Sequence, residues 1–157
     1  MGKYALELPN QHKINFSVSH FSSKWNASGQ VPQRAIDEGL ITRFGAIDDK
    51  EGGNTSRTNV NFQHTKKVGE SLLIKNTAYY SHYNFELYSN FTFFLKDSIN
   101  GDQIKQKESR DILGMQSEVH KYYTLPSGNL SWQSGVGFRY DAVNDLELAK
   151  SRAGALS

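Results

Sequence analysis

Hydrophobic and polar residues alternate along much of the chain, and the clearest case is the segment Leu130–Asp141. Its even positions are apolar apart from Ser134, and its odd positions are polar or glycine. A period of two predicts a β-strand with one apolar and one polar face. At about 3.3 Å per residue the strand is roughly 35 Å long. Tilted by about 45°, it covers about 25 Å, the height of the apolar band on an outer-membrane barrel.

The same alternation recurs elsewhere, so we expect an all-β fold in which about six long strands form an antiparallel meander. The other predicted strands are Lys3–Leu8, His12–Ser19, Arg57–Thr65, Leu72–Leu95 and Ile112–Tyr123. In Leu72–Leu95 the apolar residues change from even to odd positions between Tyr80 and Tyr83. This change indicates either a bulge or a strand that passes from one environment to another.

The connections alternate between tight turns and longer loops. PNQH, KVGE and PSGN have the composition of tight turns, whereas residues 24–54 and KDSINGD form longer connections. Short turns on one side and longer loops on the other are typical of an outer-membrane barrel. A half-buried sheet in water also alternates. The length of the strands, their polar faces of Asn, Gln, Ser, Gly and Arg, and the aromatic residues near strand ends favour the membrane interpretation.

The long connection contains GQVPQRAIDEGLITRFGAIDDKEGGNTSRT, Gly29–Thr58, in which Pro32 suits the start of a short helix and Gly39 its end. Such a short helix is not stable alone, so it must pack on neighbouring residues. We expect this packing through Ile36, Leu40, Ile41 and Phe44. Loops carry function disproportionately, so ligand contact is one hypothesis for this loop. The alternative is a loop that is folded only for its own stability.

The charged residues of this loop are the candidate ligand contacts. They are Arg34, Arg43, Asp48, Asp49 and Arg57. Guanidinium and carboxylate groups can bind charged ligands, and internal salt bridges are the competing interpretation.

The acidic residues beside Gly52 and Gly53 also suggest a calcium site. Their spacing is not that of an EF-hand, so a solvated turn is the favoured interpretation.

Composition narrows the function classes. The net charge is +2, with 18 basic and 16 acidic residues, which does not indicate a nucleic-acid partner. The absence of cysteine excludes disulfides and thiol nucleophiles. The five histidines are scattered along the sequence and predict no metal site. No catalytic or cofactor-binding motif is visible, so we expect no enzyme activity and no cofactor.

Three segments resemble TonB-dependent outer-membrane receptors. They are ASGQVPQRAIDEGLITRFGAIDDKEGGNTSRTN, YNFELYSNFTFFLKDSINGDQIKQKESRDILG and GVGFRYDAVNDLEL. The resemblance covers about Lys13 to Leu148. It implies a Gram-negative outer-membrane protein in which a 22-stranded barrel surrounds a plug. Energy comes from an inner-membrane complex, and the substrates are siderophores, haem, vitamin B12 or glycans.

The chain is much shorter than a full receptor of this family and shows no signal peptide, plug or energy-coupling box. We therefore expect residues 1–157 to be a partial barrel domain of about six strands, with a long outer loop at about residues 24–54. The expected location is the outer membrane, and the expected partners are membrane lipid, the plug, the energy-transducing complex and a small nutrient. The alternative function is a soluble or surface-exposed β-sheet module that binds carbohydrate through the aromatic-rich segment Tyr79–Phe94.

Overall fold

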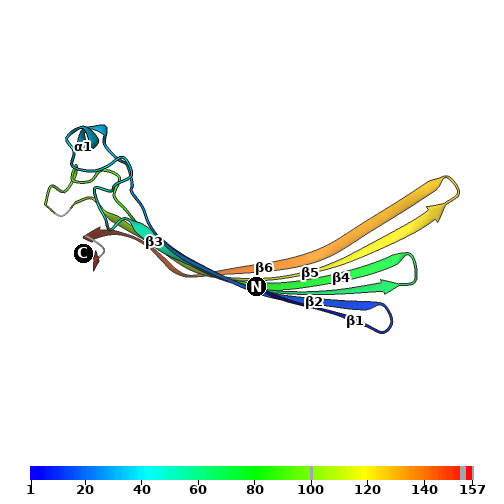
Figure 1. The fold of residues 1–157 in the computed structure, drawn as a ribbon. Coiled ribbons are helices and arrows are strands. Elements are labelled where there is room, and N and C mark those ends of the chain that lie inside the picture. Colours follow the sequence, from blue (N-terminus) through cyan, green and yellow to red (C-terminus); the bar gives the residue numbers. More distant parts are fainter. Residues whose placement is uncertain (100, 153–154, 157) are drawn as a thin grey trace. The chain divides into compact units, whose positions relative to one another are not determined.

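The computed structural model describes residues 1–99, 101–152 and 155–156. The elements in chain order are β1 (Gly2–Leu8), β2 (His12–Asn26), α1 (Gln33–Asp37), β3 (Gly52–Val68), β4 (Leu72–Ser89), β5 (Ile104–Leu125), β6 (Gly128–Arg152) and β7 (Ala155–Leu156). Each strand pairs with the next along the chain, in the sheet order β1 to β7 (Figure 1). The predicted all-β antiparallel meander with one short helix is therefore confirmed.

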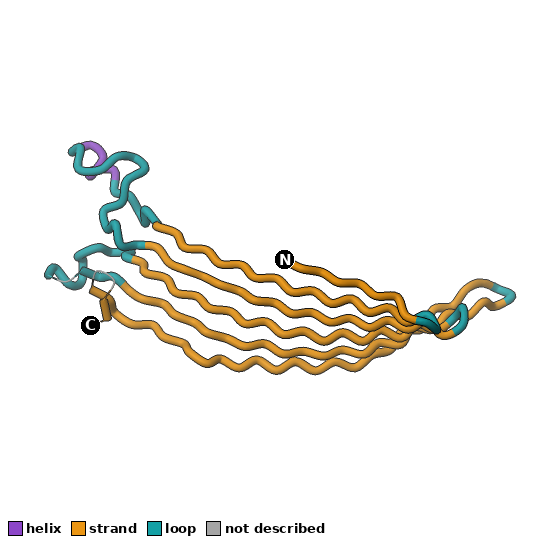
Figure 2. Tube along the Cα trace, turned by 60° about the horizontal axis from the view of Figure 1, so that its bottom comes forward, coloured by secondary structure: helices purple, strands orange, loops and turns teal. Residues whose placement is uncertain are grey.

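Four strands are clearly longer than the sequence predicts, because β2 ends later than predicted and β3, β5 and β6 extend beyond the predicted segments at both ends. One strand is shorter than predicted. Strand β4 ends at Ser89 and not at Leu95, because the following residues form a loop in which Phe93 has a φ of 54°. Strand β6 runs for 25 residues, well beyond the predicted end at Asp141. Figure 2 shows the strands side by side in one layer, with the loops and turns at their ends.

The chain divides into two compact units, each built from segments of several strands. The first unit contains Met1–His20, Arg57–His82 and Asp111–Ala142, and it includes the three tight turns. The register of its first strand pair runs from Gly2 opposite Val18 to Leu8 opposite His12. At the turn between β3 and β4, Gly69 has a φ of 61°, which glycine adopts without steric cost.

One face of the first unit is apolar. Phe62, Ala78, Met115 and Phe138 come from four neighbouring strands and line the same shallow groove of about 330 Å³. Val136 from β6 completes this wall and is 74% exposed. The apolar positions predicted from alternation in β3, β4, β5 and β6 therefore do share one face.

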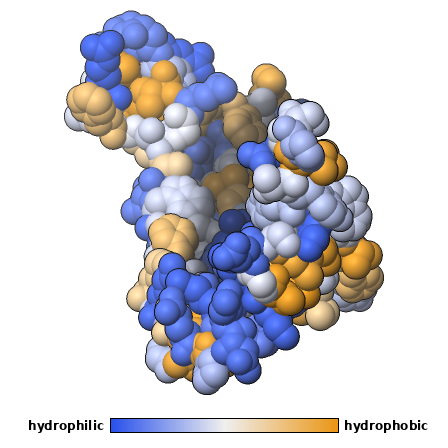
Figure 3. Space-filling model, turned by 90° about the vertical axis from the view of Figure 1, so that its right-hand side faces the viewer, coloured by the Kyte–Doolittle hydropathy of each residue, from blue (hydrophilic) through white to orange (hydrophobic). Residues whose placement is uncertain are grey.

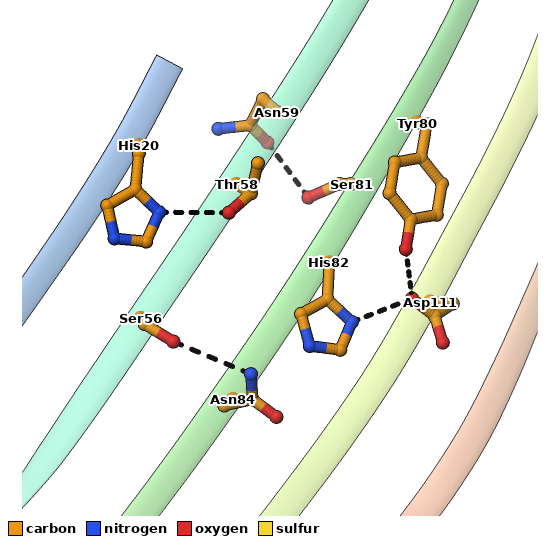
Figure 4. Close-up of polar contacts among 9 residues, drawn as sticks. All are labelled: His20, Ser56, Thr58, Asn59, Tyr80, Ser81, His82, Asn84 and Asp111. Atoms are coloured by element: carbon orange, nitrogen blue, oxygen red, sulfur yellow. Dashed lines mark hydrogen bonds and ion pairs between the residues drawn. The ribbon is translucent and has the colours of Figure 1, made fainter. Parts of the chain in front are cut away.

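Polar side chains form cross-strand hydrogen bonds in the first unit. Ser81 donates to Asn59 at 2.8 Å between β4 and β3, whereas the bidentate ion pair of Arg139 with Asp141 lies within β6. Figure 4 shows Tyr80 and His82 both directed at the carboxylate of Asp111, across β4 and β5. Polar atoms of neighbouring strands thus satisfy one another by hydrogen bonds between their side chains.

The second unit contains Phe21–Ser56, Tyr83–Arg110 and Val143–Ser157, and it holds both longer loops and α1. Here Tyr83 and Phe85 of β4 stand at odd positions: their rings are stacked 6.4 Å apart, and the Trp25 ring lies 6.4 Å from that of Phe85. The change of apolar positions predicted in β4 thus coincides with the boundary between the units. Strand β4 is continuous there.

Lys105 in the second unit is buried, with 8% of its surface exposed. Its ammonium group lies 3.5 Å from Glu86 and 3.9 Å from Glu147, and 5.9 Å from the centre of the Tyr88 ring. Burying a lysine requires such compensation. Lys107 is more exposed and pairs with Asp145 at 2.5 Å.

The described residues contain almost no enclosed apolar core. Ala35 is their only buried hydrophobic residue, whereas many large apolar side chains are exposed. Figure 3 shows hydrophobic residues in patches at the surface, among hydrophilic ones. No helix in the described part of the chain has the length and apolar character needed to span a membrane.

Candidate functional site

A pocket of about 200 Å³ in the second unit brings the two longer loops together. It is lined by Ile47, Asp48, Asp49, Lys50, Asn90, Phe93, Phe94, Gly101 and Gln103. The first loop joins β2 to β3 and contains α1, and the second joins β4 to β5. Carboxylates, amides and an ammonium group thus share one pocket with two aromatic rings.

Helix α1 lies between Pro32 and Gly39 as the sequence predicts, but Pro32 is its N-cap in an extended conformation and Gln33 is the first helical residue. Pro32 precedes its first residue, and Gly39 follows its end with a φ of 72°. The Gly39 N–H donates to Ile36 and the Leu40 N–H to Ala35, which is the Schellman pattern of helix termination. The predicted packing is wrong for Leu40 and Phe44, which are 72% and 93% exposed, because the helix buries Ala35 instead.

Asp48 connects the first loop to the ends of β4 and β5. Its Oδ1 accepts the backbone N–H of Lys50 at 3.0 Å. Its Oδ2 accepts the Asn90 amide at 3.3 Å and the Gln103 amide at 3.1 Å. Gln103 is only 2% exposed and also accepts the Ser151 hydroxyl at 3.0 Å. The polar wall of the pocket is therefore held by hydrogen bonds that span the unit.

Asp102 organises the second loop. Its carboxylate accepts the Thr92 hydroxyl at 2.7 Å and the backbone N–H groups of Lys96 and Asp97, both at 2.9 Å. The bond from Thr92 is the main cause that lowers the pKa of Asp102 below its ordinary value, because donors stabilise the ionised form. The Asp102 N–H also donates to the Phe93 carbonyl at 2.6 Å.

Phe93 has a positive φ of 54°, which is rare for a bulky residue and costs of order 1–3 kcal/mol. The bonds around Asp102 hold this conformation, and Phe93 lines the pocket. Strain of this kind clusters at binding sites. We therefore include Phe93 in the candidate site.

Glu51 lies beside the pocket with 4% of its surface exposed. It accepts the backbone N–H of Asn90 at 3.1 Å, and no lysine or arginine of the described residues forms an ion pair with it. Burial raises the pKa of Glu51, and the neighbouring Asp48 carboxylate raises it further. The Oδ1 atom of Asn90 is buried without a hydrogen-bond partner. The described residues contain no group of three His, Cys, Asp or Glu side chains suited to a metal ion.

Two of the five predicted contact residues lie in this pocket, namely Asp48 and Asp49. Arg34 on α1 and Arg43 after it are exposed in the same unit but do not line the pocket. Arg57 lies in β3 and belongs to the first unit. The loop thus contributes two of the predicted residues to the pocket, but charge alone does not predict which of its residues line it.

Sequence reasoning missed Gln103 and Phe93, and it placed Asn90 inside a strand. Gln103 is 55 residues from Asp48, and no local pattern links the two positions. The one available signal is the turn chemistry of KDSINGD, whose final aspartate organises the loop. Together, the polar wall and the two phenylalanine rings suit a ligand that has both hydroxyl groups and an apolar face.

No protein-family model, curated protein or solved structure matches this chain in comparisons of its sequence and fold.

Proposed function

We propose that the chain is part of an outer-membrane TonB-dependent receptor that takes up a scarce nutrient, such as a siderophore, metal complex, vitamin or glycan. One observation carries the proposal: the first unit exposes a broad apolar face on long paired strands, and no layer of the described residues covers it. The resemblance of three sequence segments to this family points to the same function.

The energetics favour lipid as the covering material. Met115, Val136 and Phe138 are 59%, 74% and 63% exposed on this face. Removing one such side chain from water contributes about 1.5–3 kcal/mol, and soluble monomers rarely expose large contiguous apolar patches. Strands whose backbone groups pair with neighbouring strands also meet the requirement that polar groups be satisfied within a membrane.

The connections support the same proposal. The tight turns belong to the first unit, and the loops at residues 27–51 and 90–103 belong to the second. In outer-membrane barrels short turns face the periplasm and longer loops face outward. The pocket lined by Asp48, Asp49 and Phe93 then lies among the outer loops, where a nutrient first makes contact. In the full receptor the plug and the energy-transducing complex would be further partners. We propose no nucleic-acid partner.

Refolding tests the proposal directly. The full chain is unfolded in urea and diluted into plain buffer, into detergent micelles or into lipid vesicles, and strand content and protease resistance are then measured. We expect native strand content and protection only with detergent or lipid. A monomer that folds cooperatively in plain buffer would refute the membrane assignment.

A carbohydrate-binding module is the second candidate, supported by the row of Trp25, Phe85 and Tyr83 rings in the second unit. Aromatic rings offer flat apolar surface to the C–H face of a sugar. A glycan array with the folded chain tests it, together with Phe85→Leu. Glycan binding by a chain that folds without lipid, lost in this variant, would favour the second candidate over the first.

A further inference from the structure

The apolar groove of the first unit is bordered by a row of polar side chains on the side of the tight turns. Asn76 and Ser117 line the groove beside its apolar residues, and the Ser117 hydroxyl donates to Asn76 at 2.8 Å. The Asn76 amide lies 3.3 Å from His64 Nδ1. His64 and His12 are joined by a hydrogen bond of 2.9 Å. The row thus satisfies its polar atoms within itself, as polar groups beside hydrocarbon must.

Two lysines lie beyond this polar row, closer to the turns. Alternation places Lys66 of β3 on the same face as His64, and its charge acts on His12. Lys121 of β5 lies on the same face as the row, and its ammonium group donates to the Ser71 hydroxyl at 2.8 Å. Both lysines are half-buried, so their stems pack along the sheet while their ammonium groups reach its surface.

No acidic side chain balances the two lysines. Neither Lys66 nor Lys121 forms an ion pair with a carboxylate of the described residues. The other residues that alternation places on this face at the turn end of β3, β4 and β5 are Val68, Leu72, Ile74, Val119 and Tyr123. The face therefore presents an apolar groove with two cations at one end, which is complementary to an anion that carries an apolar chain.

We propose that this groove and the two lysines bind one anionic phospholipid, with an acyl chain in the groove and the headgroup phosphate between Lys66 and Lys121. The inference rests on the proposed membrane location of this face. Hydrogen bonds from ammonium groups to phosphate are strengthened by the charges of both partners. The Ser71 hydroxyl, which already meets Lys121, can donate to the same phosphate.

The dimensions of the face fit this arrangement. Met115 lines the groove, and Lys121 lies about 20 Å from it along β5, at about 3.3 Å per residue. At a tilt of about 45° this is about 14 Å across the membrane, about half of the roughly 25–30 Å apolar thickness. Only β4 separates the strands of Lys66 and Lys121, a sideways distance of about 10 Å. The flexible stems of both lysines can therefore bring their ammonium groups to one phosphate above β4.

Native mass spectrometry of the full chain refolded in detergent micelles tests the site. The chain is titrated with phosphatidylglycerol or with phosphatidylcholine that has the same acyl chains. We expect one phosphatidylglycerol to bind at least about tenfold more tightly than phosphatidylcholine. Lys66→Gln and Lys121→Gln should each weaken phosphatidylglycerol binding about fivefold and leave phosphatidylcholine binding unchanged. The matched control is Lys75→Gln, which should change neither affinity, because alternation places Lys75 on the opposite face of β4.

A second variant tests the groove. Ala78→Phe should weaken the binding of both lipids, because Ala78 lines the groove and a larger side chain there would fill it. Millimolar inorganic phosphate should not displace the lipid, because the groove holds the acyl chain.

Three results would overturn the site: equal affinity of the wild-type chain for the two lipids, a preference for phosphatidylglycerol that survives replacement of both lysines, or displacement of the lipid by inorganic phosphate, which would indicate a site for free phosphate. Any of these in a chain that folds only with detergent or lipid would reject the lipid site and leave the receptor proposal standing. A chain that folds cooperatively in plain buffer would reject both.

Discussion

An arginine on the apolar face of the first unit would test whether that face meets lipid. Val136 is the chosen position because it is 74% exposed and lies beside Phe138 and Met115. Within the first unit the large apolar side chains of β6 run from Leu130 to Tyr140, about 33 Å along the strand. At a tilt of about 45° they cover about 23 Å, and Val136 is within a few ångströms of the middle.

The expected cost of Val136→Arg depends entirely on what covers the face. At the middle of a bilayer an arginine costs about 2–4 kcal/mol in the free energy of folding, a factor of about 30 to 1,000 in the equilibrium constant. With a urea dependence of about 2 kcal/mol per molar, the unfolding midpoint should fall by roughly 1–2 M. In water an exposed substitution changes stability by less than about 0.5 kcal/mol.

Urea titration of the chain in phosphatidylcholine vesicles measures this shift, with the fluorescence of Trp25 and Trp132 as the reporter. Gln133→Arg is the matched control, because Gln133 lies on the same strand beside the polar Gln116 and Glu118 and should tolerate the charge. A Val136→Arg midpoint equal to that of the wild-type chain would show that the apolar face does not contact lipid. Equal losses in both would show only a general intolerance of arginine and would equally refute the argument.

Three further predictions follow from single contacts. Gly114→Ala should destabilise the first unit by about 1–3 kcal/mol, because an added Cβ would overlap the tyrosine ring that covers this glycine; thermal unfolding measures the loss. Lys105→Met should cost about 1–3 kcal/mol, because two partly buried glutamates lose their shared cation; urea unfolding measures it. Glu51→Gln should stabilise the chain at pH 7, because folding raises the pKa of the Glu51 carboxyl above 4.5 and its ionisation therefore opposes folding. The free energy of unfolding is measured against pH. In the wild type it should fall as the pH rises through the folded pKa of Glu51, and in the variant it should be flatter.

The first two of these predictions have a control at another position. Gly137→Ala should be tolerated, because its Cβ would meet only ordinary contacts at 3.5 Å or more; an equal loss there would reject the steric explanation for Gly114. Lys107→Met should matter less than Lys105→Met, because Lys107 is 39% exposed. A Glu51→Gln variant that loses stability at pH 7 would contradict the assigned cause of the raised pKa.

Local patterns are sufficient to predict most of the fold. Alternation identifies the strands, and Pro32 and Gly39 mark the ends of the helix, because these signals act within a few residues of the chain. The prediction of β4 fails beyond Ser89 for a physical reason. Phe91 and Phe93 continue the alternation, but the bonds to Asp102 hold the backbone in a loop instead.

The candidate site depends on pairings that no local pattern encodes. Asp48 meets Gln103 where the two longer loops come together, across more than 50 residues. His12 meets His64 across a similar distance along the chain, because the register between strands decides which side chains become neighbours. Register also decides that Lys105 is buried while Lys107 is more exposed, although the two look alike in the sequence. The sequence by itself determined the strands, the turns and the polarity of each strand face, since these follow from residue chemistry at short range. Only the tertiary structure decided which of these faces and loops combine, because strand pairing joins residues that are distant along the chain.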